Sequence, residues 1–160
     1  MTQSNVNPDK YIAITAENEN QILEAAAEIM AAKYASGESY CSASATKDFL
    51  RFKLGQYDRE VFSVMLLNSQ HQLIEYRELF FGTINSASVY PREVAKAVLS
   101  QNAAAVIFAH NHPSGNPEPS QADILITKRL SDALSLIDVS VLDHIVVGET
   151  TISMAERGLL

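Results

Sequence analysis

Residues 103–123 read Ala-Ala-Ala-Val-Ile-Phe-Ala-His-Asn-His-Pro-Ser-Gly-Asn-Pro-Glu-Pro-Ser-Gln-Ala-Asp. The first seven residues, 103–109, form a continuous apolar run, which is the pattern of a strand covered on both faces of a sheet. The segment 111–119 contains three prolines and one glycine and therefore predicts a loop. Apolar residues at helical spacing then predict a long amphipathic helix from about Ser120 to Ile137.

Two histidines lie where this expected strand runs into the loop. In an extended backbone, residues i and i+2 point to the same face, so the rings of His110 and His112 can approach one ion if the strand persists through Asn111. The loop would then return the chain so that Asp123 approaches from the other side. Two imidazoles and one carboxylate are the protein ligands of many catalytic zinc sites, whose fourth position stays open to water. The pattern predicts a site for one zinc ion and a metal-dependent hydrolase.

A structural interpretation explains part of the same pattern without catalysis. Ser120 precedes Asp123 by three residues, which is close to the spacing of a capping box at a helix N-terminus. The two interpretations are compatible, because an acid in the first helical turn is held rigidly enough to serve as a metal ligand. The hydroxyl of Ser120 would then be free to face a substrate.

The remaining elements indicate a single domain, which is the expected size for 160 residues. The expected elements are a helix from Asn20 to a stop at Gly37, a helix over about 46–54, strands at 60–67 and 73–81 that form a hairpin, a helix from Pro91 to about Gln101, and strands at 139–147 and 151–154. This order predicts a mixed α/β fold in which helices flank a central β-sheet.

Composition and charge restrict the function classes. The net charge of −7 argues against general affinity for nucleic acid, because such binding uses lysine and arginine to neutralise phosphates. The single cysteine, Cys41, can form no internal disulfide and excludes a cysteine-rich metal site. The N-terminus lacks the segments of a signal peptide, and no apolar run reaches the ~20 residues that cross a bilayer. We expect a cytoplasmic protein with no membrane partner.

Two other zinc-enzyme classes do not fit this sequence. A zincin needs the motif His-Glu-x-x-His, which is absent. A zinc deaminase needs His-x-Glu together with a Cys-x-x-Cys pair, which one cysteine cannot supply.

The spacing His-x-His-x7-Ser-x2-Asp resembles the motif of the JAMM (JAB/MPN-type) metalloproteases. The flanking sequence is similar to the RadC branch of that family in the stretches 85–94, 103–107, 110–115, 142–148 and 155–159. The resemblance covers about residues 40–160 and is most specific over 82–123. It implies an MPN/JAMM hydrolase domain at 40–160, preceded by a lead-in and a helix at 1–39.

The resemblance also implies roles for individual residues. His110, His112 and Asp123 would bind zinc, and Ser120 would stabilise the transition state. An upstream glutamate would act as general acid and base, and the matching position is Glu60, with Glu75 and Glu78 as competitors. The implied substrate is a peptide or protein, cleaved at a peptide, isopeptide or other amide bond.

Two alternative functions remain open at this stage, as does the oligomeric state. The RadC family is commonly associated with DNA repair, but its longer members carry a helix-hairpin-helix module, and no glycine-rich hairpin occurs in residues 1–55. An inactive scaffold for a partner protein is the other alternative, although a scaffold has no need of a full ligand set. The role of His144 also stays open between a hydrogen-bonded structural residue and a contact to the metal site.

Overall fold

The computed structural model describes residues 15, 18–35, 43–82 and 89–160. The predicted helix stop at Gly37, the lone Cys41 and the predicted boundary after residue 39 lie outside the described residues, as do residues 85–88 of the family-like stretch. Among the described residues, no helix is long and apolar enough to cross a membrane.

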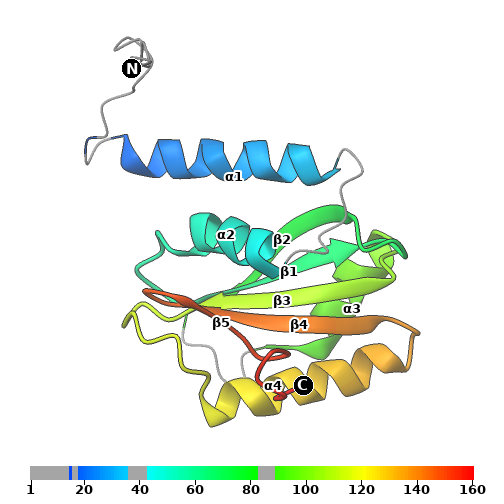
Figure 1. Ribbon diagram of the computed structural model, residues 1–160. Helices are drawn as coiled ribbons and strands as arrows, with labels where there is room; N and C mark the ends of the chain where they lie inside the picture. The colour runs from blue at the N-terminus through cyan, green and yellow to red at the C-terminus, as the bar shows by residue number, and fades with distance from the viewer. Residues whose placement is uncertain (1–14, 16–17, 36–42, 83–88) are drawn as a thin grey trace, which may run out of the picture.

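Four helices and five strands occur in the described part of the chain (Figure 1). They are α1 (Glu19–Ala35), α2 (Ala43–Leu54), β1 (Val61–Leu67), β2 (Leu73–Phe81), α3 (Pro91–Ser100), β3 (Ala105–Asn111), α4 (Gln121–Ser135), β4 (Ser140–Val147) and β5 (Thr151–Ser153). The strands form one mixed sheet in the order β2-β1-β3-β4-β5. β3 and β4 are parallel, and the other neighbours are antiparallel. The predicted mixed α/β fold and the predicted hairpin of β1 and β2 are confirmed.

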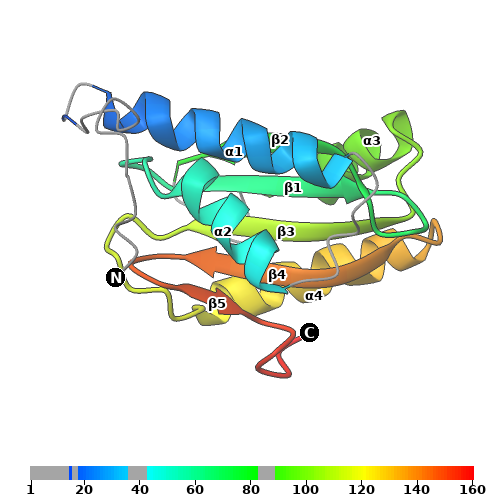
Figure 2. The same ribbon diagram turned by 45° about the horizontal axis from the view of Figure 1, so that its top comes forward.

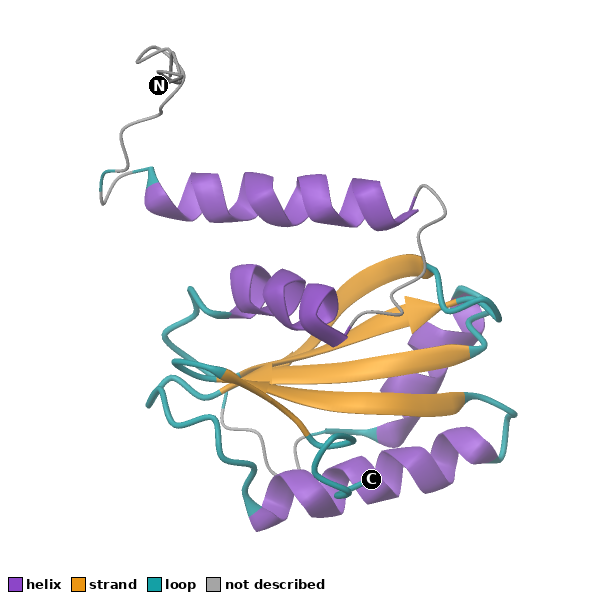
Figure 3. Cartoon of the chain, viewed as in Figure 1, coloured by secondary structure: helices purple, strands orange, loops and turns teal. Residues whose placement is uncertain are grey.

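The sheet lies between two pairs of helices, with α1 and α2 on one face and α3 and α4 on the other (Figures 2 and 3). Every residue of β1 and β3 is buried, because both strands are central and each face carries an apolar cluster. Phe62 and Phe108 point to the α3 and α4 face, whereas Met65 and Ile107 point to the α1 and α2 face. The prediction that the apolar run belongs to a strand covered on both faces is therefore confirmed.

Several element ends differ from the sequence prediction: α2 begins at Ala43 instead of about residue 46, and α4 ends at Ser135 instead of about Ile137. β3 covers 105–111 instead of 103–109, because the amide of Ala103 donates to Val98 O and belongs to the end of α3. Asn20, the predicted start of α1, lies inside the helix, because the helix begins at Glu19 and the carbonyl of Asn18 accepts from the amide of Ile22 at 2.9 Å.

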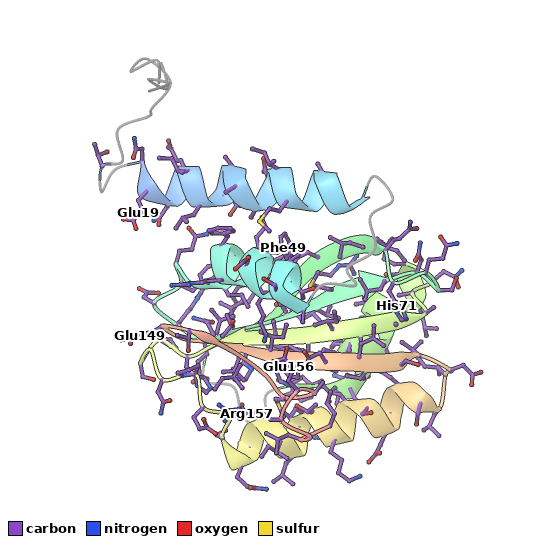
Figure 4. The ribbon with its side chains drawn as sticks, viewed as in Figure 1. Glu19, Phe49, His71, Glu149, Glu156 and Arg157 are labelled. Carbon is purple, nitrogen blue, oxygen red and sulfur yellow. The ribbon has the colours of Figure 1, made fainter. Side chains whose placement is uncertain are left out.

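The loop after β3 is fastened to the turn between β4 and β5 by a close backbone approach. The amide of Glu149 donates to Gly115 O at 2.7 Å. A Cβ atom added to Gly148 would lie 2.4 Å from the same oxygen, so only glycine fits at this position. Gly115 itself has a φ of 84°, in the left-handed region that favours glycine. Glu149 marks this turn at one end of the sheet in Figure 4, and His71 marks the turn between β1 and β2 at the opposite end.

The substitution Gly148→Ala tests this contact. The added methyl group should force the 113–117 loop away from the turn and lower the free energy of unfolding by about 1–3 kcal/mol, as overpacking does elsewhere. Denaturant titration measures the change. Thr150→Ala in the same turn is the control and should alter stability by less than about 0.5 kcal/mol, because this side chain is exposed. Equal stabilities of the two variants would contradict the contact.

Candidate metal centre

His110 of β3 and His112, directly after its end, place their rings on one face of the sheet because β3 stays extended through Asn111. His110 pairs with Phe62 of β1 in antiparallel register. The amide of His112 continues this geometry by donating to Val147 O of β4 at 2.8 Å. The Nε2 atoms of His110 and His112 consequently lie 2.9 Å apart, with His110 fully buried and His112 partly exposed.

The first turn of α4 supplies the carboxylate. Ser120 is the N-cap of α4 and forms the predicted capping box with Asp123. Both the amide and the hydroxyl of Ser120 donate to Asp123 Oδ2, at 2.7 and 2.6 Å. These two donors leave Oδ1 to face the histidines, 3.2 Å from His110 Nε2, whereas Oδ2 lies 3.5 Å from His112 Nε2. The helix cap therefore also orients the carboxylate.

A hydrogen bond on the far side of the His112 ring determines what the ring presents to this site. Its Nδ1 lies 2.7 Å from the carbonyl oxygen of Asn116. A carbonyl oxygen can only accept, so Nδ1 carries the proton and the neutral ring presents a lone pair at Nε2. On the other ring, His110 Nδ1 lies 2.8 Å from His144 Nε2, which leaves its Nε2 facing Asp123.

The protonation equilibria show that this cluster attracts positive charge. Burial alone would raise the pKa of Asp123, but hydrogen bonds from His110 and His112 outweigh it and hold the pKa well below its usual range. The hydrogen bond to Asp123 raises the pKa of His112 despite the burial of the ring. Burial lowers the pKa of His144 well below its usual value, and His110 acts in the same direction. Asp123 is thus an anion that attracts either a proton on His112 or a metal ion.

The donor atoms of His110, His112 and Asp123 form a group that could hold a metal ion. In a tetrahedral zinc site with ligand distances of about 2.0–2.1 Å, neighbouring donor atoms lie about 3.3 Å apart. Here the two Nε2 atoms lie 2.9 Å apart, Oδ1 of Asp123 lies 3.2 Å from His110 Nε2, and Oδ2 of Asp123 lies 3.5 Å from His112 Nε2. With one ligand atom taken from each residue, the three atoms all lie within 4.8 Å of one another. Two imidazoles and one carboxylate also match the ligand chemistry of zinc and leave one position for water.

Asn111 points away from the two histidines and fastens the segment before β1. The side chain is buried, and its Oδ1 accepts from the amide of Val61 at 2.7 Å. Its Nδ2 donates to Tyr57 O at 3.2 Å and to Arg59 O at 2.9 Å. One amide side chain therefore holds the whole 57–61 segment against the end of β3.

This clamp places Glu60 next to the metal site. Glu60 directly precedes β1, and its carbonyl accepts from the amide of Gly82 at 2.9 Å. In the antiparallel register that pairs Phe62 with His110, Glu60 reaches the level of His112. The hydrogen bond to Asp123 is the main cause of the raised pKa of His112, and the charge of Glu60 raises it further.

The two competing glutamates are engaged elsewhere. Glu78 accepts hydrogen bonds from the hydroxyls of Tyr57 at 2.9 Å and Tyr76 at 3.1 Å. Tyr76 packs on the α1 and α2 face, which is opposite to the face of the metal site. Glu75 forms a two-pronged ion pair with Arg77, with distances of 3.0 and 2.7 Å. Glu60 is therefore the strongest candidate for an acid and base at the site.

Comparison with known proteins agrees with this geometry. Residues 40–159 match the family model described as the RadC-like JAB domain. The chain belongs to the RadC-like JAB domain family. The resemblance noted in the sequence is thereby confirmed, and the sheet flanked by helices is consistent with a JAB/MPN domain.

Sequence similarity to relatives of this JAB domain covers nearly all of the chain. Two proteins of Vibrio cholerae serotype O1, both named UPF0758 protein, are 63% and 56% identical. The first alignment covers 89% of this chain and 90% of the relative, and the second covers 94% and 96%. A UPF0758 protein of Cellvibrio japonicus is 53% identical over 94% of this chain but only 66% of its own length.

Two residues that support the site of this JAB domain, Asn111 and Thr127, were not predicted from the sequence. Thr127 Oγ1 lies 2.5 Å from Nδ1 of His144, whose role the sequence left open. The sequence does indicate that Thr127 lies near the site, because it follows Asp123 by four residues and therefore shares its face of α4. For Asn111 the only signal was its place between the histidines, since its partners lie about fifty residues upstream.

A pH titration tests the assignment of Glu78 in this JAB domain to a tyrosine cluster. Burial, together with the hydrogen bond to Glu78, raises the pKa of Tyr57 to about 12. The stabilisation that this gives is complete below about pH 10, the usual tyrosine pKa, and is lost as the pH rises towards the raised value. Glu78→Gln should lower the pKa of Tyr57, because the neighbouring negative charge is removed.

Phenolate absorbance, followed as the pH is raised, measures this shift. Tyr57→Phe identifies which part of the titration curve belongs to that residue. A curve for Glu78→Gln that coincides with the wild-type curve would show that Glu78 does not interact with Tyr57 and would return it to the candidates for a general base.

Proposed function

We propose that this JAB domain is a zinc-dependent hydrolase of the JAMM type that cleaves a peptide, isopeptide or other amide bond. The observation that carries the proposal is the convergence of His110 Nε2, His112 Nε2 and the carboxylate of Asp123 on one small volume. Such a cluster of acceptors is stable only with a cation among them. An inactive scaffold for a partner protein would have no use for this arrangement.

A zinc ion held by these three residues would lower the pKa of a coordinated water towards about 7 and polarise the amide carbonyl. Glu60, at the level of His112, takes one proton from the attacking water. The water oxygen bonds to the carbonyl carbon, the C–N bond breaks, and Glu60 returns the proton to the leaving nitrogen. The products are a carboxylic acid and an amine.

Ser120 has two tasks in this proposal. In the structure its hydroxyl donates to Asp123 Oδ2 and accepts from the amide of Asp123 at 3.2 Å, so it caps the helix. Rotation of this hydroxyl would let it donate to the oxyanion that develops on the substrate carbonyl. One donor aimed at a developing oxyanion contributes on the order of 10²–10³ in rate in other hydrolases.

We propose a peptide or protein as the substrate and the cytoplasm as the place of action. Direct binding of nucleic acid is disfavoured by the net charge of −7. The role in DNA repair commonly associated with the RadC family is not required by the chemistry of this site.

Metal analysis tests the first part of the proposal. Wild-type protein purified without chelator should contain about one zinc ion per chain by mass spectrometry, because three ligands are preorganised. His110→Ala should lose the metal, since it removes a buried ligand. His71→Asn is the control, because His71 is exposed at the opposite end of the sheet and asparagine tolerates its φ of 59°. Equal metal contents in all three proteins would refute the site.

The substitution Glu60→Gln tests the second part. The variant should keep its zinc but lose about 10²–10⁴-fold in turnover, because glutamine cannot carry the proton. A panel of fluorogenic peptides and lysine-linked isopeptides supplies the assay. Glu75→Gln should keep both metal and turnover, since Glu75 pairs with Arg77 on β2. Full activity of Glu60→Gln alongside an active wild type would exclude Glu60 as the acid and base.

A further inference from the structure

Behind the metal site, a buried line of hydrogen bonds joins α4, β4 and β3. Thr127 Oγ1 lies 2.6 Å from Asp123 O and 2.5 Å from His144 Nδ1. His144 Nε2 lies 2.8 Å from His110 Nδ1. His110 and His144 are fully buried and Thr127 is 1% exposed, so these groups depend on one another for hydrogen bonds.

The directions of these hydrogen bonds follow from what each atom can do. Asp123 O is a carbonyl oxygen and can only accept, so the hydroxyl of Thr127 donates to it. The oxygen of Thr127 is then free to accept, and His144 Nδ1 carries the proton that it accepts. A neutral imidazole has one proton, so His144 Nε2 accepts in turn from His110 Nδ1.

The opposite order of donors does not satisfy the same contacts. If Thr127 donated to His144, its oxygen and Asp123 O would lie 2.6 Å apart with no hydrogen between them. That contact between two lone pairs is repulsive. The arrangement that satisfies the contacts of Thr127 and His144 therefore puts a proton on Nδ1 of His110. Its Nε2 faces Asp123 Oδ1 at 3.2 Å, where a metal ion would take the place of a shared proton.

We propose that Thr127 and His144 are positioning residues that fix the tautomer and the ring orientation of His110, so that its Nε2 is available to the metal ion. The proposal rests on the zinc site proposed above. It explains why a polar threonine and a histidine occur among apolar side chains, where the rings of Phe62 and Phe108 lie 5.6 and 6.0 Å from the ring of His144.

The same series of hydrogen bonds connects two of the proposed metal ligands, His110 and Asp123. Asp123 contributes its carboxylate to the site and its carbonyl oxygen to Thr127, one turn later on α4. A circuit therefore closes from Asp123 through Thr127 and His144 to His110, whose other nitrogen returns to Asp123. The position of α4 against β3 and β4 and the orientation of the ligands are thus set together.

Zinc affinity, measured by competition with a chromophoric chelator, is the first test. Thr127→Val has the same shape but no hydroxyl, and His144→Phe fits among the aromatic neighbours but accepts no hydrogen bond. We expect each to weaken zinc binding by about 10–100-fold, the usual effect of removing a partner of a ligand. Thr127→Ser restores the hydroxyl and should restore the affinity.

Ile145→Ala is the matched control for lost stability. Ile145 is the next residue on β4, is buried and belongs to the apolar cluster on the opposite face, so its truncation should destabilise the fold by about 2–5 kcal/mol. Zinc affinity should stay at the wild-type value, because the substitution removes none of the hydrogen bonds that link Asp123 to His110 through Thr127 and His144. The pair Thr127→Val and Thr127→Ser keeps the test valid even if His144→Phe does not fold.

The nitrogen-15 spectrum of the imidazole rings in the metal-free protein reads the tautomers directly, and four histidines make its assignment simple. We expect His110 and His144 both to carry their proton on Nδ1. A His110 ring without a proton on Nδ1, or wild-type affinity in both Thr127→Val and His144→Phe, would overturn the inference. Failure of the wild type to bind zinc would instead refute the proposed metal site, while the spectrum still decides the tautomer.

Discussion

The extended backbone of β3 through Asn111 is the constraint on which the site depends. Because side chains alternate along a strand, this one stretch sends His110 and His112 to one face and Asn111 to the other. The histidines meet Asp123, whereas Asn111 clamps the backbone before β1 and brings Glu60 to the same end of the sheet. A break in the strand at this residue would separate the ligands and release the candidate base.

Helix capping and metal-site geometry use the same atoms in this protein. The capping box of α4 needs the carboxylate of Asp123 to accept from Ser120, and this hydrogen bonding turns the second oxygen to the histidines. The next turn of the helix adds Thr127, which begins the hydrogen-bond chain to His144 and His110. A substitution at Ser120 would therefore affect stability and chemistry together, unlike one at Glu60.

Burial makes the hydrogen-bond directions in this site decisive. Exposed imidazoles exchange tautomers freely in water, but His110 and His144 are buried. In the contacts described above, the nitrogens of His144 meet only Nδ1 of His110 and the hydroxyl of Thr127. The lone pair that His110 would offer to a metal ion is therefore set by groups outside the candidate metal site. Comparable support comes to His112 from the carbonyl oxygen of Asn116 in the loop.

The sequence alone was sufficient for features that depend on near neighbours. Hydrophobic period predicted the strands and helices, the i, i+2 spacing predicted that His110 and His112 share a face, and Ser-x-x-Asp predicted the cap. Only the tertiary structure decided that His144 contacts His110, thirty-four residues away, and that Asn111 holds a segment fifty residues upstream. The tertiary structure also distinguishes Glu60 from Glu75 and Glu78 as the candidate general base. These three glutamates occupy different faces or different ends of the sheet, which their local sequence does not reveal. Local periodicity sets the direction of a side chain, but strand order and register decide what it meets.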